Sequence, residues 1–219
     1  MPFLSSQQLT IYSRSIISLS LERLYHSSSL KFWTAMSHIP EQVKLCLKDL
    51  IERLKKYRVK YMVIGAIPIH FYGRPRTSAD IDVVLVSHKD KERLHQILAN
   101  RYVLYYDGKN VLKFIDNVTK TGVDILLSLK TVGLNQESLK RIRKVKVDDL
   151  TIPVPCPEDY IITKLKARRP DTFDFSDVMS VLLNMHDKID WEYLTKRAKE
   201  EKLSHLIEYY REGLKWKIS

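Results

Sequence analysis

The stretch that decides the fold is GRPRTSADIDVV, which spans residues 73–84. Side chains alternate between the two faces of a β-strand, so Asp80 and Asp82 project from one face while the apolar residues beside them enter the core. Two neighbouring carboxylates repel each other unless a cation lies between them. A hard cation that prefers oxygen ligands, such as Mg²⁺, meets that requirement. The stretch therefore predicts a strand that carries metal ligands.

A third carboxylate, Asp124, lies in the apolar sequence GVDIL at residues 122–126. Burying an unpaired aspartate is unfavourable, so a functional site is the economical reason for an acid in such a strand. Three carboxylates on neighbouring strands predict a two-metal site with Mg²⁺ or Mn²⁺, in which the ions stand about 4 Å apart. One ion lowers the pKa of an attacking hydroxyl, and the other neutralises a triphosphate.

A turn without bulky side chains precedes this region, at Gly65 and Ala66 in the sequence YMVIGA of residues 61–66. The run before Gly65 is apolar and predicts a short buried strand. A glycine turn that leads into a helix lets backbone N–H groups approach phosphate, and the helix N-terminus adds partial positive charge. The turn is therefore a candidate phosphate-binding site.

Periodicity and turn signals predict an α+β fold, with a mixed sheet, covering helices and an all-helical C-terminal part. Pro157 at a first helical position and two acids behind it mark the start of one C-terminal helix. The predicted strands are residues 61–64, 81–86, 102–106, 111–115, 123–127, 145–147 and 152–154, and the predicted helices are 41–57, 89–99, a short one before 142, 157–168, 173–185, 191–200 and 203–214.

These motifs resemble the minimal nucleotidyltransferases of the DNA polymerase beta superfamily. Within that superfamily, the chain is most similar to the AbiEii-like toxin and related stand-alone nucleotidyltransferases of bacteria and archaea. The resemblance covers about residues 55–183. The matching positions are Gly65, Arg76, Asp80, Asp82, Asp124, Pro157-Glu158-Asp159, Lys164, Arg168, and Asp174 or Asp177.

The resemblance implies roles for these residues. Asp80 and Asp82 hold metal, and Asp124 completes the site and orients the acceptor hydroxyl. Two departures stand out: Ala66 replaces the second small residue of the family turn, and Ser78 replaces the usual threonine. Contacts to the nucleotide are expected from Gly65, Ala66, Arg76, Ser78, Lys164 and Arg168.

Lys164 and Arg168 are four residues apart, so they share one face of a helix and could grip a triphosphate together. Asp174 and Asp177 share a face of the next helix and are candidate accessory residues. The alternative for all four is a surface ladder of salt bridges.

Composition bounds the class of protein. The chain has 219 residues and a formal net charge of +11, which favours polyanionic partners such as nucleoside triphosphates and RNA. Its two cysteines, Cys46 and Cys156, have no disulfide or metal spacing. From Met36 onward, charged residues interrupt every apolar stretch, so we expect a soluble cytoplasmic protein without a membrane span.

Residues 1–35 differ from the rest, because they are rich in serine and carry a single acid, Glu22. The composition is typical of a targeting peptide. We favour Met36 as the true start of translation, since the folded pattern begins after Pro40. The expected organisation is an N-terminal extension at 1–35, a catalytic core at 36–155 and a helical region at 156–219.

The sequence thus predicts an enzyme that moves a nucleoside monophosphate from a triphosphate to a hydroxyl. The charge favours RNA as the acceptor, and the family resemblance implies a tRNA 3′ end, a toxin-like role and a cognate antitoxin as partner. A protein hydroxyl, as in AMPylation, and a small molecule are alternatives. Two other hypotheses are a catalytically silent nucleotide- or nucleic-acid-binding module, which Ala66 supports, and a sugar transferase, whose metal motif Asp80-Ile81-Asp82 resembles.

Overall fold

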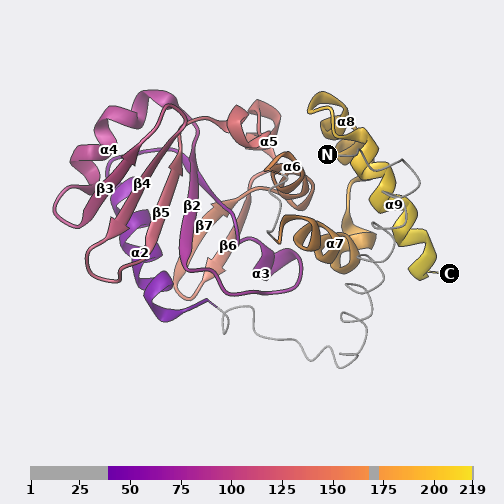
Figure 1. The fold of residues 1–219 in the computed structure, drawn as a ribbon, viewed down its shortest axis with the longest axis horizontal. Helices are drawn as coiled ribbons and strands as arrows, with labels where there is room; N and C mark the ends of the chain where they lie inside the picture. The colour runs from indigo at the N-terminus through magenta and orange to yellow at the C-terminus, as the bar shows by residue number, and fades with distance from the viewer. Residues whose placement is uncertain (1–38, 168–172, 219) are drawn as a thin grey trace, which may run out of the picture. The chain divides into compact units, whose positions relative to one another are not determined.

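The computed structural model describes residues 39–167 and 173–218, so the predictions for residues 1–35 and for Arg168 lie outside the described residues. Figure 1 shows the arrangement of the elements. The strands are β1 (Tyr61–Ile64), β2 (Asp80–Leu85), β3 (Tyr102–Asp107), β4 (Val111–Asp116), β5 (Gly122–Leu126), β6 (Arg143–Val147) and β7 (Leu150–Val154). The helices are α2 (Glu41–Lys56), α3 (Ile69–Tyr72), α4 (Lys91–Leu98), α5 (Gln136–Lys140), α6 (Pro157–Ala167), α7 (Asp174–Met185), α8 (Trp191–Glu200) and α9 (Ser204–Ile218), with short 3₁₀ turns at His88–Asp90, Leu129–Val132 and His186–Lys188.

A five-stranded mixed sheet forms the centre of the fold, with the strand order β1-β2-β5-β4-β3. β2 and β5 pair in parallel, and the other neighbours in this sheet pair antiparallel. β6 and β7 form a separate two-stranded sheet, which contacts β1 through β7. The predicted α+β fold with a mixed sheet and a helical C-terminal part is confirmed.

Helix α2 covers one face of the large sheet, because its apolar residues recur at helical spacing. It contacts β2 and α4. The strands present apolar residues to this covered face, and Ile81 and Val83 of β2 are fully buried there. The opposite face carries the alternate residues of the same strands, including Asp80 and Asp82, which are more accessible. The buried residues of α2 are Val43, Cys46, Leu47, Leu50, Ile51 and Leu54.

Two details differ from the sequence expectations. The helix after Gly65 has four residues, Ile69–Tyr72, so it offers no extended helix dipole to a phosphate. Proline at position 68 and Gly73 at its end confine it to one turn. The helix predicted at 89–99 is a 3₁₀ turn followed by α4.

Among the described residues, no helix combines the length and apolar composition that crossing a membrane requires.

Helix α6 is buried on nearly all sides and holds the C-terminal helices together. It contacts α7 and α8. Asp159 at its start and Arg197 of α8 are both fully buried, and the guanidinium Nε donates to Asp159 Oδ1 at 3.1 Å. Tyr193 donates to the other carboxylate oxygen at 2.9 Å, and Arg197 also donates to the carbonyl of Gly133. Asp159 of the Pro157-Glu158-Asp159 motif therefore helps to hold α6 against α8.

Replacing Arg197 with methionine should strongly destabilise the protein, because Asp159 would remain buried without its cation. Removing one partner of a buried ion pair costs about 3–5 kcal/mol. Urea unfolding followed by circular dichroism measures the change. Lys196→Met, in the same helix but half-exposed, is the matched control and should change the free energy of unfolding little. Equal stability of the two variants would contradict this role of Arg197.

Candidate active site

Strand pairing brings the three predicted acids to one place. In the parallel pair of β2 and β5, Asp82 lies directly opposite Asp124, and Asp80 lies opposite Gly122. Directly paired residues project from the same face of a sheet, so all three carboxylates lie on the face that α2 leaves open. Asp80 is exposed, and Asp82 and Asp124 are half-buried. The sequence prediction that these acids share one face of neighbouring strands agrees with this register.

The turn at Gly65 lies directly against the Asp82 carboxylate. Gly65 has a φ of +72°, a left-handed conformation that favours glycine, and a Cβ atom there would overlap the side chain of Asp82. Ala66 is buried beside it. The backbone of this turn therefore approaches the carboxylates closely, which only a residue without a side chain permits at position 65.

A lysine that the sequence analysis did not single out stands at the carboxylates. Lys113 of β4 is the register partner of Asp124 and forms an ion pair with it. The hydrogen bond to Asp124 raises the pKa of Lys113, burial opposes this shift, and the charges of Asp124 and Asp82 and the nearby Tyr105 add to it. The third acid, Asp80, accepts a hydrogen bond from Ser78 Oγ at 2.7 Å.

The donor set suits a hard divalent cation, since all three acids supply oxygen ligands. Lys113 shows that positive charge is already favoured at this position. In the side-chain arrangement described, no three acidic, histidine or cysteine side chains converge as a ready metal cluster. Asp80 and Asp124 instead face Ser78 and Lys113. Metal binding would require these two acids to exchange those partners for the ion.

A second charged cluster joins the other predicted residues. Lys164 of α6 is buried between two acids of α7, at 2.8 Å from Asp177 and 3.2 Å from Asp174. Arg76, in the loop before β2, pairs with Asp177 at 3.1 Å. Lys164, Asp174 and Asp177 are each at most 4 % exposed in their side chains, which rules out the surface ladder of salt bridges for these three.

Tyr160 links this cluster to the turn at Gly65. Its hydroxyl lies 3.1 Å from the carbonyl oxygen of Gly65, to which it donates, and 3.5 Å from Asp177. Burial raises the pKa of Tyr160 well above its usual value, so the hydroxyl remains a neutral donor. Burial is the largest single influence on Arg76 and disfavours its charge, but the hydrogen bond to Asp177 and the charges of Asp177, Tyr160 and Asp174 together raise the pKa of Arg76.

Lys113 and Tyr160 are the residues of the site that sequence reasoning missed. A lysine in the middle of an apolar strand was a visible signal, because its position alternates with buried Leu112 and Phe114. Which acid it would meet depended on the pairing of β4 with β5, which no local pattern reveals. Tyr160 gave no local signal, since aromatic residues in an apolar helix are usually core.

A cavity of about 630 Å³ lies elsewhere, between the β1 edge, β7 and α5. None of its lining residues is acidic, so it is separate from the three carboxylates. The hydroxyl of Tyr61 in its wall has no hydrogen-bond partner among the described residues, and burial raises the pKa of Tyr61 to about 12.

Residues 41–217 match the family described as "Nucleotidyltransferase of unknown function (DUF6036)". The match spans most of the chain, which therefore belongs to this family of nucleotidyltransferases. The resemblance to the nucleotidyltransferase superfamily is thus confirmed, while the AbiEii-like subtype stays a prediction. No curated protein matches the sequence.

Solved structures agree on the fold. An antigenic nucleotidyltransferase-like protein from Paracoccidioides brasiliensis superposes with a TM-score of 0.52 at 12 % identity, covering 78 % of this chain and 93 % of that one. The solution structure of the antibiotic-resistance factor ANT(2″)-Ia superposes with a TM-score of 0.54 at 10 % identity, covering 77 % of this chain and 96 % of that one. A crystal structure of ANT(2″)-Ia in complex with adenylyl-2″-tobramycin superposes with a TM-score of 0.50 at 14 % identity, covering 74 % of this chain and 98 % of that one. At these identities the likeness shows the fold alone.

Replacing Lys113 with methionine should make the protein more dependent on divalent cations. The variant keeps Asp82 and Asp124 side by side without their ammonium, so like-charge repulsion should lower its melting temperature in EDTA. Saturating Mg²⁺ should then raise that temperature by a few degrees more than in the wild type; about 1 kcal/mol corresponds to roughly 2–4 °C at this chain length. Exposed Lys130→Met is the control. Equal Mg²⁺ shifts in all three proteins would contradict the assignment.

Replacing Lys164 with methionine should destabilise the protein by about 3–5 kcal/mol, because two buried carboxylates would lose their shared cation. Adding Asp174→Asn to the same chain should recover part of that loss, since it removes one of the two carboxylates that Lys164 neutralised, while Arg76 still pairs with Asp177. Urea unfolding of the wild type, the single variant and the double variant measures both effects. A double variant less stable than the single one would show that the charge balance among these residues is not what holds the cluster.

Proposed function

We propose that this protein transfers a nucleoside monophosphate from a nucleoside triphosphate to a hydroxyl group of RNA. The observation that carries the proposal is the pairing of Asp82 with Asp124 across β2 and β5, with Asp80 beside them on the open face of the sheet. A triad of acids at this position, in a chain that belongs to a nucleotidyltransferase family, supports group transfer at phosphorus.

Asp80, Asp82 and Asp124 would hold two Mg²⁺ ions, or Mn²⁺, which supply charge neutralisation for a bound triphosphate. Asp124 would orient the acceptor hydroxyl and accept its proton. In the transfer, the hydroxyl oxygen forms a bond to the α-phosphorus, and the bond between that phosphorus and the bridging oxygen of pyrophosphate breaks. Pyrophosphate leaves with the electron pair of the broken bond.

The turn at Gly65 and Ala66 would bring backbone N–H groups to the triphosphate, because no side chain at position 65 blocks the approach. Ser78, whose Oγ donates to Asp80 in the arrangement described, would donate to the nucleotide once Asp80 turns to the metal. Arg76 would contribute positive charge beside the turn, and the contact of Arg168 with the nucleotide stays a prediction from the sequence. Since Asp174 and Asp177 now neutralise Lys164, we propose that it acts on the nucleotide mainly by positioning Tyr160 and the Gly65 turn.

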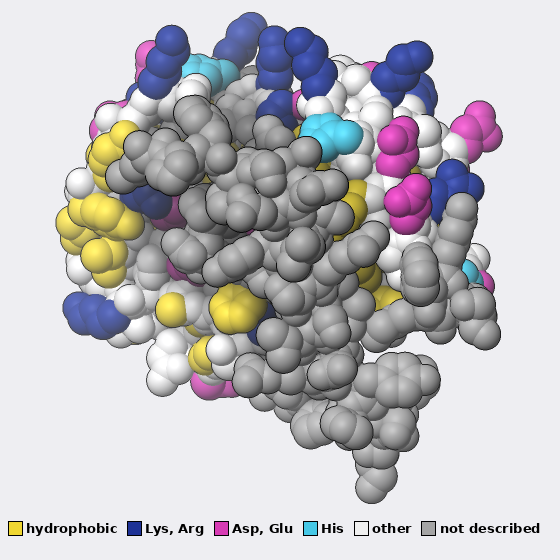
Figure 2. Space-filling view, turned by 45° about the vertical axis from the view of Figure 1, so that its right-hand side comes forward, with side chains coloured by type: hydrophobic (Ala, Val, Ile, Leu, Met, Phe, Trp, Pro, Cys, Tyr) yellow, Lys and Arg dark blue, Asp and Glu magenta, His cyan; other side chains and the backbone are white. Residues whose placement is uncertain are grey.

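The net charge of +11 supports RNA as the acceptor. Figure 2 shows Lys and Arg side chains gathered along the upper margin of the view, where they meet solvent. A toxin-like role with a tRNA 3′ end as substrate and an antitoxin as partner rests on the AbiEii-like resemblance. A small-molecule acceptor is the second candidate, because ANT(2″)-Ia, which shares the fold, has been crystallised with an adenylylated antibiotic.

The test supplies the full chain with each of the four α-³²P-labelled nucleoside triphosphates, Mg²⁺ and total cellular RNA, and then separates labelled RNA, labelled protein and free nucleotide. We expect label on RNA with one preferred nucleotide. Asp80→Asn and Asp82→Asn should each reduce the transfer by at least about a thousandfold, because each removes an oxygen ligand and one charge from the site. Melting curves confirm that both variants are folded.

Asp149→Asn is the matched control, since this exposed acid lies in the β6–β7 turn and pairs with Lys48. It should transfer at the wild-type rate. Label found on protein in place of RNA would show that the acceptor hydroxyl belongs to a polypeptide. Folded wild-type protein that labels neither RNA, protein nor small molecules would favour a silent binding module and defeat the proposed activity.

A further inference from the structure

The open face of the sheet continues beyond the carboxylates to the edge strand β3. Directly paired residues on neighbouring strands lie side by side on one face, so the register traces rows across the sheet. Two such rows start at the acids of β2 and end on β3. One row consists of Asp82, Asp124, Lys113 and Tyr106, and the other consists of Asp80, Gly122, Ile115 and Val103.

The β3 end of these rows is an exposed apolar surface. Val103 is 50 % exposed, Tyr105 55 %, Tyr106 51 % and Ile115 39 %. We call these four residues the tyrosine platform. Large apolar side chains gathered on a surface are more informative than single exposed ones, because they mark places where a partner binds. This platform shares its face with the three catalytic acids.

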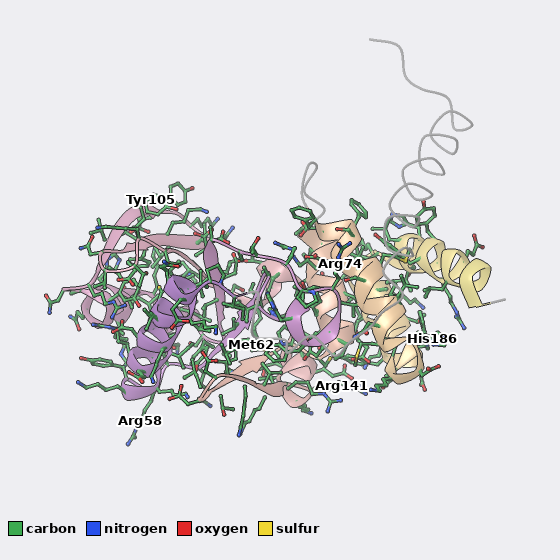
Figure 3. All side chains as sticks on the ribbon, turned by 90° about the horizontal axis from the view of Figure 1, so that it is seen from below. Arg58, Met62, Arg74, Tyr105, Arg141 and His186 are labelled. Carbon is green, nitrogen blue, oxygen red and sulfur yellow. The ribbon has the colours of Figure 1, made fainter. Side chains whose placement is uncertain are left out.

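An irregularity in the strand places both tyrosines on this face. The register between β3 and β4 shifts between Leu104 and Tyr106, so Tyr105 and Tyr106 together oppose Lys113. A bulge of this kind re-aims side chains that would otherwise point to opposite faces. The electrostatic influence of Tyr105 on Lys113 agrees with this placement. Figure 3 shows Tyr105 projecting from the sheet on the side away from Arg58.

The second tyrosine is held in position by its neighbour in the hairpin. A Cβ atom at Gly108 would lie 2.5 Å from Cε1 of Tyr106, so the ring packs directly over the glycine backbone. This contact fixes the ring of Tyr106 beside the turn that joins β3 and β4. A ring that is already ordered loses little conformational entropy when a ligand stacks on it.

We propose that the tyrosine platform binds the terminal bases of a single-stranded RNA acceptor, an inference that rests on the proposed function. Neighbouring strands lie about 4.8 Å apart, so Tyr106 stands two strands, or roughly 10 Å, from Asp124. That span matches an acceptor whose terminal ribose hydroxyl lies at Asp124 while a base of the same end stacks on the tyrosine rings. Lys113, between them, faces the connecting phosphate.

The chemistry of the platform favours bases over other occupants. Tyrosine rings stack on the π-faces of all four bases, and Val103 and Ile115 extend the apolar contact. The net charge of +11 attracts the phosphate backbone that carries those bases. Because stacking does not distinguish the bases by hydrogen bonding, we expect little sequence preference from this surface.

The experiment uses the full-length protein, a fluorescein-labelled twelve-nucleotide RNA of mixed sequence, and fluorescence anisotropy in low salt without nucleotide. The test variant is Tyr105→Thr with Tyr106→Thr, because threonine keeps the strand propensity and removes both rings. We expect its affinity for the RNA to fall at least about tenfold, as the loss of stacking predicts. The double variant with phenylalanine at both positions keeps the rings and should bind within twofold of the wild type.

Tyr57→Thr is the matched control, since Tyr57 is also an exposed tyrosine, 42 % accessible, but follows α2 on the covered side of the sheet. Its affinity for RNA should not change. Affinity for a fluorescent ATP analogue, measured in parallel, should be the same in all variants, because the platform does not contact the triphosphate. A general loss of folding would lower both affinities together.

Each outcome separates the platform from the proposed reaction. Wild-type RNA affinity in the threonine variant, or equal losses in the threonine and phenylalanine variants, would overturn the platform even if RNA is the acceptor. Binding that needs the rings, in a protein that transfers no label to RNA, would support the platform and defeat the transfer proposal. Absence of RNA binding by the wild type would overturn the platform as an RNA surface and favour a small-molecule or protein acceptor.

Discussion

The placement of Asp82 directly opposite Asp124 is the constraint on which the rest of the site depends. Like charges in directly paired positions destabilise a sheet, so the fold must compensate them where they stand. Lys113 on the next strand supplies the cation, and the glycine at position 65 leaves space for the Asp82 carboxylate. These features would have little purpose around an apolar pair. Together they indicate that the sheet keeps the repulsion between Asp82 and Asp124 because the two carboxylates form a site that attracts positive charge.

The C-terminal helices complete the site and are more than an appendage to the sheet. Tyr160 of α6 donates to the carbonyl of Gly65, and Lys164 of the same helix is balanced by two acids of α7. Arg76 joins α7 to the loop before β2. The turn next to the carboxylates is therefore fixed from two sides, by β1 and by α6. A change in the helical region can therefore shift the turn beside the carboxylates without replacing an acid.

Much of this architecture was readable from the sequence because its signals are local. The alternation of Asp80 and Asp82 with Ile81 and Val83 predicted a strand at 81–86 and the face of its acids, and the structure has this strand at Asp80–Leu85. The hairpin between β3 and β4 followed from Asp107 and Gly108 between apolar runs. The acids of α7 were correctly placed on one helix face, yet their burial against Lys164 was not foreseen, because burial depends on which helices pack together. Lys113 was missed for a similar reason: strand pairing decides what it meets, and pairing is not local. Helix α3 is short because Pro68 before it and Gly73 after it limit a run of residues whose apolar character alone would favour a longer helix.

The parallel pairing of β2 with β5 also determines when the site can exist during folding. The β3–β4 hairpin is local and belongs to a class of structures that forms within about 1–10 μs. The pairing of β2 with β5 is non-local, so its contacts form only at the entropic cost of closing the chain between them. Hairpin formation alone assembles Lys113 and the tyrosines but no acid pair. A slip of one residue in the β2–β5 register would turn Asp82 into the core and Ile81 outward. A divalent cation bound at these acids would therefore report that β2 and β5 have paired in the correct register, whereas a chain trapped in the wrong register would be compact yet lack the acid pair.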